Sequence, residues 1–111
     1  MQTIATVHLV RHGEVHNPDR VLYGRLDGFG LSELGHRMAD GVAEWFLHRA
    51  NRIRRHPALV AASPLLRAQQ TAAPIAGAFS RPLLTEPNLI EAENAFEGIC
   101  LLYTSDAADD S

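Results

Sequence analysis

Two arginines and a histidine follow two separate apolar segments, in positions where they could bind and attack a phosphoryl group. Arg11-His12-Gly13-Glu14 comes directly after the β-branched run at residues 4–10, and Arg67 comes shortly after a second apolar run at residues 58–62. A guanidinium offers forked donors that suit phosphate oxygens. A histidine that is neutral near pH 7 can act as a nucleophile, and Gly13 allows close backbone approach. These residue types predict phosphoryl-transfer chemistry.

Each motif has an ordinary alternative when it is taken alone. Three common residues can coincide at a strand end, and Arg67 can be an exposed helical arginine beside a Ser-Pro cap. Both motifs, however, place an arginine just after a buried strand. Ligands of open α/β sheets bind beyond the carboxyl ends of the strands. The pair therefore favours a two-armed phosphate clamp.

The elements that must position these side chains can be predicted from patterning. Residues 4–10 are typical of a strand buried on both faces. Ser32 is expected to cap a helix that begins at Glu33 and runs to about His48, before a basic, solvated connection at residues 51–56. Its predicted buried stripe, at helical spacing, is Leu34, Met38, Val42, Trp45 and Phe46.

The second half repeats the alternation. Residues 58–62 predict a strand, Ser63 is expected to cap the next helix with Pro64 in its first turn, and Pro82 is expected to end it before a short strand at residues 83–85. The apolar face predicted for this helix is Leu65, Ala68, Ala72, Ile75, Ala76 and Phe79. Alternating strands and helices indicate a parallel α/β sheet with right-handed crossovers.

Composition restricts the class of protein. The 111 residues argue for one domain. The formal net charge of −3 offers no general attraction to nucleic acid or an anionic membrane. No apolar run approaches the roughly 20 residues of a membrane span, and the first ten residues do not resemble a signal peptide. We therefore expect a cytoplasmic protein without nucleic-acid or membrane partners.

The histidines His8, His12 and His16 recur every four residues, an interval that could indicate a metal site. That interval aligns ligands on a helix, but this segment is predicted to be a strand running into a loop, where the three side chains do not converge. We therefore predict no metal, and a packed His8.

The motifs Leu9-Val10-Arg11-His12-Gly13-Glu14 and Ser63-Pro64-Leu65-Leu66-Arg67-Ala68-Gln69-Gln70-Thr71-Ala72 together resemble the two N-terminal motifs of the histidine phosphatase superfamily. The intervening segment is similar too, at Asn17, Tyr23-Gly24-Arg25, Asp27 and Leu31-Ser32-Glu33-Leu34-Gly35. The resemblance runs from about Thr3 to Gly98. It implies a three-layer α/β/α sandwich of the phosphoglycerate-mutase-like type, with a parallel sheet.

The resemblance also implies roles for individual residues. His12 would become phosphohistidine, and Arg11 and Arg67 would bind the phosphoryl oxygens. Glu14 and Asn17 would line the phosphate pocket. Neither a cofactor nor a metal is implied.

Residues 89–98 resemble the segment that carries the family's general acid, and their spacing to Gly98 singles out Glu91. A carboxyl in that role must be protonated at working pH, so its surroundings should raise its pKa. The alternative is a surface carboxylate among Glu86, Glu93 and Glu97.

The sequence departs from the family pattern after this segment. The family has a second histidine on a later Gly-His-Ala-like motif, whereas every histidine here lies at or before His56. We therefore expect residues 1–98 to be a C-terminally truncated histidine phosphatase domain. Residues 99–111 are expected to be a disordered or artefactual tail outside the family.

The function implied is a phosphatase that transfers the phosphoryl group of a small phosphomonoester to His12 and then to water. Two alternatives stay open: a phosphoglycerate-mutase-type phosphotransferase, and a catalytically incomplete fragment that only binds phosphate. The short loop after His12 favours hydrolysis over mutase chemistry.

Overall fold

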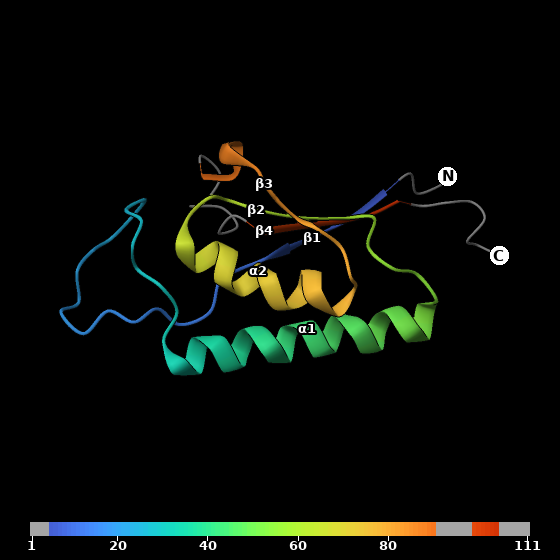
Figure 1. Cartoon of the computed structure of the whole chain (residues 1–111), viewed down its shortest axis with the longest axis horizontal. Helices are drawn as coiled ribbons and strands as arrows, with labels where there is room; N and C mark the ends of the chain where they lie inside the picture. The colour runs from blue at the N-terminus through green and yellow to red at the C-terminus, as the bar shows by residue number, and fades with distance from the viewer. Residues whose placement is uncertain (1–4, 91–98, 105–111) are drawn as a thin grey trace.

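A four-stranded sheet with two α-helices packed on it forms the protein in this computed structural model, which describes residues 5–90 and 99–104 (Figure 1). In chain order the elements are β1 (Ala5–Val10), α1 (Glu33–Ile53), β2 (Leu59–Ala62), α2 (Leu66–Ala78), β3 (Leu83–Thr85), a short 3-10 helix η1 (Pro87–Ile90) and β4 (Ile99–Thr104). The strand–helix alternation predicted up to residue 85 is therefore confirmed.

The sheet has the strand order β1-β4-β2-β3. Strands β2 and β3 are parallel, with Val60 opposite Leu83. Strand β4 is antiparallel to both β1 and β2, so β1, β2 and β3 all run in one direction, as predicted.

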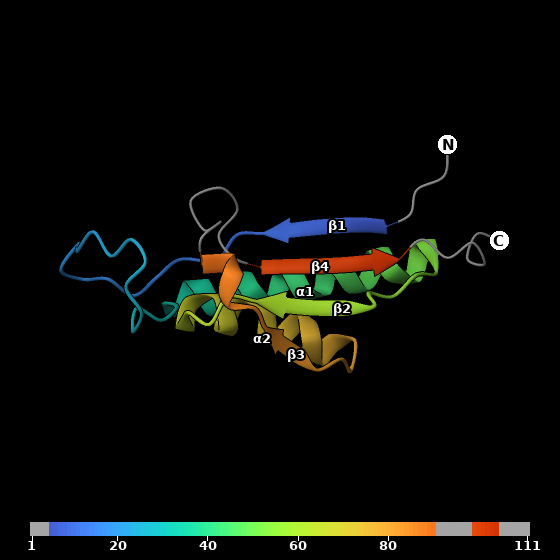
Figure 2. The same ribbon diagram turned by 90° about the horizontal axis from the view of Figure 1, so that it is seen from above.

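The presence of β4 differs from expectation. No ordered element was expected after Gly98, yet Ile99–Thr104 lies between β1 and β2 and points the opposite way (Figure 2). The segment is a short run of apolar and β-favouring residues, and its central position lets it pair its backbone N–H and C=O groups on both sides.

Both helices cover the same face of the sheet (Figures 1 and 2). The crossovers from β1 to β2 and from β2 to β3 move in one direction, and right-handed crossovers of that kind place their helices on one side. Of the three layers expected, the described residues form two. The opposite face carries half-exposed apolar side chains, including Val7 at 49% and Leu9 at 53% exposure.

Helix α1 begins as predicted and ends later. Ser32 caps it, since its side chain accepts a hydrogen bond from the Gly35 N–H. The helix continues past His48 to Ile53, because residues 49–53 include the good helix formers arginine and alanine and contain neither Gly nor Pro. It ends at Arg54, which has a left-handed φ of 58°. In the described part of the chain, neither helix is long and apolar enough to cross a bilayer.

The buried face of α1 matches the predicted stripe only in part, because Phe46 is buried and Val42 packs against the core. Leu34, Met38 and Trp45 are about half exposed. The buried positions carry mainly small side chains: Gly35, Ala39, Ala43, Phe46 and Ala50. Helix α2 likewise buries Ala68, Ala72 and Ala76, so the two helices pack closely. Small residues thus form most of the interface between α1 and α2, and the larger apolar side chains of Leu34, Met38 and Trp45 lie outside it.

Helix α2 buries the predicted face, but its capping differs. Leu65, Ala68, Ala72, Ile75 and Ala76 are buried, and Phe79 packs against the core. Ser63 was expected to cap the helix, yet the first helical residue is Leu66. Its N–H donates instead to Asp27 Oδ1, at 2.7 Å. A residue from a distant loop therefore supplies the cap.

Candidate active site

A cavity of about 520 Å³ lies where β1 ends and the loop toward α1 begins. Its lining residues come from the end of β1, the following loop and the first turns of α1: Arg11, His12, Gly13, Glu14, Val15, Tyr23, Leu34 and Met38. The structure therefore brings together three of the predicted site residues, Arg11, His12 and Glu14. Arg11 and Glu14 are exposed and His12 is half-buried.

The hydrogen bond of His12 defines which ring nitrogen can react. Its Nδ1 lies 2.8 Å from the carbonyl oxygen of Gly13. A carbonyl oxygen only accepts hydrogen bonds, so Nδ1 must carry the proton in this contact. In the neutral ring the lone pair is then on Nε2. This tautomer presents Nε2 as the nucleophilic atom.

Two glycines, Gly13 and Gly35, allow the backbone of the His12 segment to lie directly against the start of α1. A Cβ at Gly13 would lie 2.8 Å from the Gly35 carbonyl oxygen, and a Cβ at Gly35 would overlap the Glu14 carbonyl oxygen. Ser32 completes the contact, because its hydroxyl donates to Glu14 Oε1 at 2.7 Å and its N–H donates to the Glu14 carbonyl at 2.9 Å. The close backbone approach brings Leu34 and Met38 to the cavity.

Helix α2 holds the same segment from the other side through Thr71. The buried Thr71 Oγ1 accepts from the Gly13 N–H at 3.3 Å and donates to the Arg67 carbonyl at 2.8 Å. The Gly13 backbone is therefore tied to the helix that carries Arg67.

Arg67 itself is fully buried and turned toward the loop that precedes α1. Its Nη1 donates to the Leu26 carbonyl at 2.8 Å and its Nη2 to the Gly24 carbonyl at 2.7 Å. Its guanidinium carbon lies 4.5 Å from the centre of the Tyr23 ring, and Tyr23 lines the cavity. The Tyr23 ring thus lines the cavity and Arg67 packs against that ring, and contact of Arg67 with phosphate stays a prediction.

Two other loop residues also stabilise the loop itself. The Asn17 side chain donates to the Val21 carbonyl at 2.8 Å and accepts from the Val21 N–H at 3.0 Å. It is not among the residues that line the cavity, and its predicted place in the phosphate pocket stays a prediction. A side-chain amide that mimics backbone pairing is typical of a turn. Asp27 accepts from Leu66 and Gly28, and these N–H groups lower the pKa of its carboxyl.

Glu91, the predicted general acid, lies outside the described residues. The roles assigned to Arg11, His12, Glu14 and Arg67 remain predictions. Sequence reasoning missed Thr71, Leu34 and Met38 as parts of the site. Thr71 lies inside a quoted motif without being singled out, and Leu34 and Met38 were assigned to the buried stripe because helical spacing alone cannot say which side of a helix faces a cavity.

The histidines do not gather around a common point. His8 packs edge-on against Phe46, with ring centroids 5.2 Å apart, as predicted for a packed histidine. Burial, and to a lesser extent Arg49, lower its pKa. Among the side chains that the structure describes, at residues 6–90, no three His, Cys, Asp or Glu side chains lie together in a way that could hold a metal ion.

Known proteins match the chain in both sequence and fold. The model of the histidine phosphatase superfamily (branch 1) matches residues 7–100. An uncharacterized protein of Mycobacterium tuberculosis, Rv0525, is 52% identical over 92 residues, which are 83% of this chain and 43% of that protein. The chain therefore spans about two fifths of the length of this relative.

Solved structures give the same result. A mycobacterial glucosyl-3-phosphoglycerate phosphatase with inorganic phosphate matches with a TM-score of 0.60 and 31% identity, over 78% of this chain and 36% of that chain. A putative phosphohistidine phosphatase, SixA from Agrobacterium tumefaciens, matches at a TM-score of 0.60 over 88% of this chain and 67% of that chain. At 19% identity, this second likeness concerns the fold alone. The family match over most of the chain, with the α/β fold of these enzymes, means that the chain belongs to the histidine phosphatase superfamily, branch 1.

Proposed function

We propose that the protein is a phosphatase that transfers the phosphoryl group of a small phosphomonoester to Nε2 of His12 and then to water. The observation that carries the proposal is the hydrogen bond between His12 Nδ1 and the Gly13 carbonyl, inside a cavity that also contains Arg11. It directs the lone pair of a neutral imidazole to Nε2, which is the condition for nucleophilic attack on phosphorus.

In the first step Nε2 forms a bond to phosphorus while the bond from phosphorus to the ester oxygen breaks. Arg11 supplies positive charge to the phosphoryl oxygens as this happens. The leaving oxygen takes up a proton, and Glu91 is our candidate donor. In the second step a water oxygen attacks phosphorus, the bond to Nε2 breaks, a proton of the water passes to the carboxylate that the candidate donor Glu91 became in the first step, and inorganic phosphate leaves.

The cavity also constrains the substrate. Tyr23, Leu34 and Met38 form an apolar side of the cavity beside Arg11 and His12. A small ester with its phosphate at Arg11 could place the rest of the molecule against this side, since small-molecule sites combine apolar walls with a few polar anchors. The phosphatases among the structural relatives support hydrolysis over transfer to a second substrate.

The non-catalytic alternative has one specific observation in its favour. Arg67 donates to two loop carbonyls, so in this arrangement its two terminal nitrogens already have protein acceptors. A protein in which only Arg11 and the His12 segment meet phosphate could bind the anion without turnover.

Hydrolysis of p-nitrophenyl phosphate distinguishes the two readings. The proposal predicts release of p-nitrophenol that is abolished in His12→Ala and retained in His36→Ala, a matched change at an exposed histidine on α1 outside the cavity. Saturable phosphate binding without turnover would instead support the binding-only alternative.

A further inference from the structure

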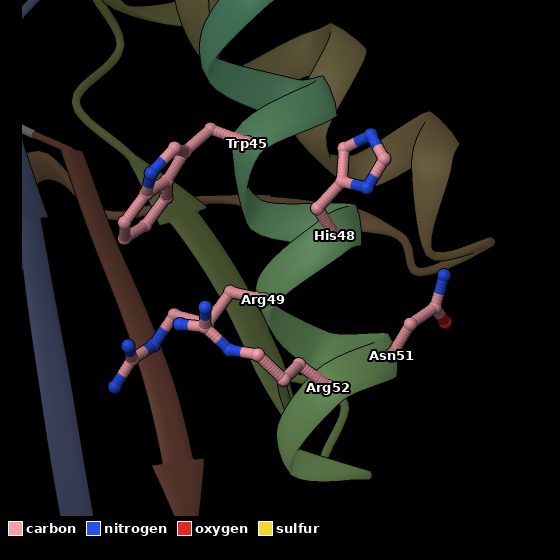
Figure 3. A pocket seen from close by; sticks show the side chains of 5 residues that line it. All are labelled: Trp45, His48, Arg49, Asn51 and Arg52. Atoms are coloured by element: carbon pink, nitrogen blue, oxygen red, sulfur yellow. The ribbon is translucent and has the colours of Figure 1, made fainter.

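The far end of α1 carries a second cavity, distinct from the one at His12. It has a volume of about 460 Å³ and is lined by Trp45, His48, Arg49, Asn51 and Arg52 (Figure 3). Arg49 lies eleven residues beyond Met38, the last α1 residue of the first cavity, which is about 16 Å along the helix axis at 1.5 Å per residue. The two cavities are therefore separate.

The charged side chains that line this cavity and those of the residues that follow it, up to Thr85, are all positive. Residues 45–85 contain six of the ten arginines and neither aspartate nor glutamate, although the whole protein has a net charge of −3. Four of these arginines fall within residues 49–55, where α1 ends. The ring of His56 packs edge-on against that of Phe79 at the end of α2, with centroids 5.6 Å apart. The end of the basic segment therefore lies beside the end of α2.

Helix capping does not account for so many arginines. A helix C-terminus carries roughly half a negative charge, which a single arginine in the last turn offsets. Arg52 occupies that turn. In the part of the chain that is described, no carboxylate lies within ion-pair distance of Arg49, Arg52 or Arg54. Most of the positive charge at this end therefore has no counter-charge from the described residues.

Three of the lining side chains converge. Trp45, Arg49 and Arg52 are spaced by four and three residues, which places them on one face of the helix. Figure 3 shows all three pointing to the same side of α1, while His48 and Asn51 point to the other. Arg49 lies 5.8 Å from the centre of the Trp45 ring. Its buried Nε–H has no hydrogen-bond acceptor among the described residues, so the hydrogen-bonding capacity of this guanidinium is not used up by the protein.

We infer that this cavity is an anion site that binds a phosphate group between Arg49 and Arg52, beside Trp45. Forked guanidinium donors match phosphate oxygens in geometry and charge. The volume of about 460 Å³ leaves room for inorganic phosphate or for a small organic phosphate ester, which share this chemistry. Trp45 offers an apolar surface for the rest of such an ester.

Trp45 is the only tryptophan in the sequence, so its fluorescence reports on this cavity alone. The full chain carrying His12→Ala, which cannot turn over an ester through His12, is titrated with inorganic phosphate and separately with glycerol 3-phosphate. Sodium chloride at matched ionic strength is the blank, and calorimetry gives an independent affinity. We expect a saturable response to phosphate beyond that of the chloride blank.

Variants locate the response. Arg52→Gln should weaken binding about tenfold, as expected for losing one charged hydrogen-bond donor. Arg49→Gln should do the same, and Arg49→Lys should lose less because it keeps the charge. Arg37→Gln, an exposed change on the same helix, and Arg11→Gln in the first cavity should leave the Trp45 response intact. Thermal unfolding verifies that each variant is folded.

The outcomes separate the sources of the anion and the rival surfaces. Tighter binding of glycerol 3-phosphate than of phosphate supports an organic ester as the ligand, and the reverse order supports inorganic phosphate. A response equal to that of sodium chloride, or one unchanged in folded Arg49→Gln and Arg52→Gln, overturns the inference. Binding of a single-stranded oligonucleotide without binding of phosphate also overturns it, in favour of a nucleic-acid surface.

Discussion

The contact between the His12 segment and the start of α1 can be tested with a pair of alanine substitutions on one helix. A Cβ at Gly35 would overlap the Glu14 carbonyl oxygen and lie 3.0 Å from two further backbone atoms of Glu14. A Cβ at Gly41 would meet nothing within 4 Å. Both positions are inside α1, so both alanines gain about the same helix propensity, roughly 0.8–1 kcal/mol.

The difference between the two variants therefore isolates the steric cost at Gly35. Overpacking typically costs about 1–3 kcal/mol. We expect the upper part of that range, because backbone atoms of Glu14 cannot rotate away as a side chain would. Gly41→Ala should be more stable than the wild type by about 0.8 kcal/mol, and Gly35→Ala less stable than Gly41→Ala by about 3 kcal/mol.

Thermal unfolding followed by circular dichroism measures both. One kcal/mol corresponds to about 4–8 °C in Tm for domains near this size, so a difference of this magnitude is easily resolved. Gly35→Ala should also impair phosphomonoester hydrolysis, since displacements of about 1 Å in an active site can cost about a hundredfold in rate. Equal stability and equal activity of the two variants would refute the close contact between Gly35 and Glu14.

Three further predictions follow from other contacts. Thr71→Val should leave the buried Gly13 N–H without its acceptor and destabilise the protein by about 1–3 kcal/mol in chemical denaturation. Thr71→Ser keeps the hydroxyl and should recover most of that loss. Equal effects of the two substitutions would count against the hydrogen bond. The pKa of Asp27 is depressed in the folded state, so its carboxylate should stabilise the protein above the ordinary aspartate pKa and lose this contribution as pH falls through the folded pKa. Asp27→Asn should therefore flatten the acid side of a profile of stability against pH. A profile of the variant that runs parallel to that of the wild type would contradict the cap. The double variant Val7→Thr, Leu9→Thr should reduce binding of a hydrophobic dye and self-association in ultracentrifugation, because both side chains are half exposed on the sheet face without helices. If neither measurement changes, this face does not promote association.

Periodicity and capping rules predicted the elements well, and they failed where tertiary contacts decide. The Ser32 cap and the apolar face of α2 depend on local sequence, and both were predicted correctly. The buried face of α1 depends on how closely α2 approaches. Alanines fit that approach, so Leu34 and Met38 were free to line the cavity. The Asp27 cap joins residues that are far apart in sequence, which no local rule detects.

The candidate site shows the same division. The prediction from strand ends placed Arg11 and His12 where β1 ends, and both side chains line the cavity at that edge of the sheet. The same logic could not foresee that Arg67 turns to the carbonyls of Gly24 and Leu26, since the path of that loop depends on its own turns. The strand β4 was also missed, although Ile99–Thr104 is a short apolar run of the kind that forms strands and pairs on both edges.

Trapping of the covalent intermediate tests the central claim most directly. The protein is mixed with a phosphomonoester, quenched in base, under which phosphohistidine survives, and examined by phosphorus NMR and mass spectrometry. We expect phosphate on Nε2 of His12, because Nδ1 holds its proton against the Gly13 carbonyl. Phosphate on Nδ1, or turnover that persists in His12→Ala with no phosphohistidine formed, would contradict it.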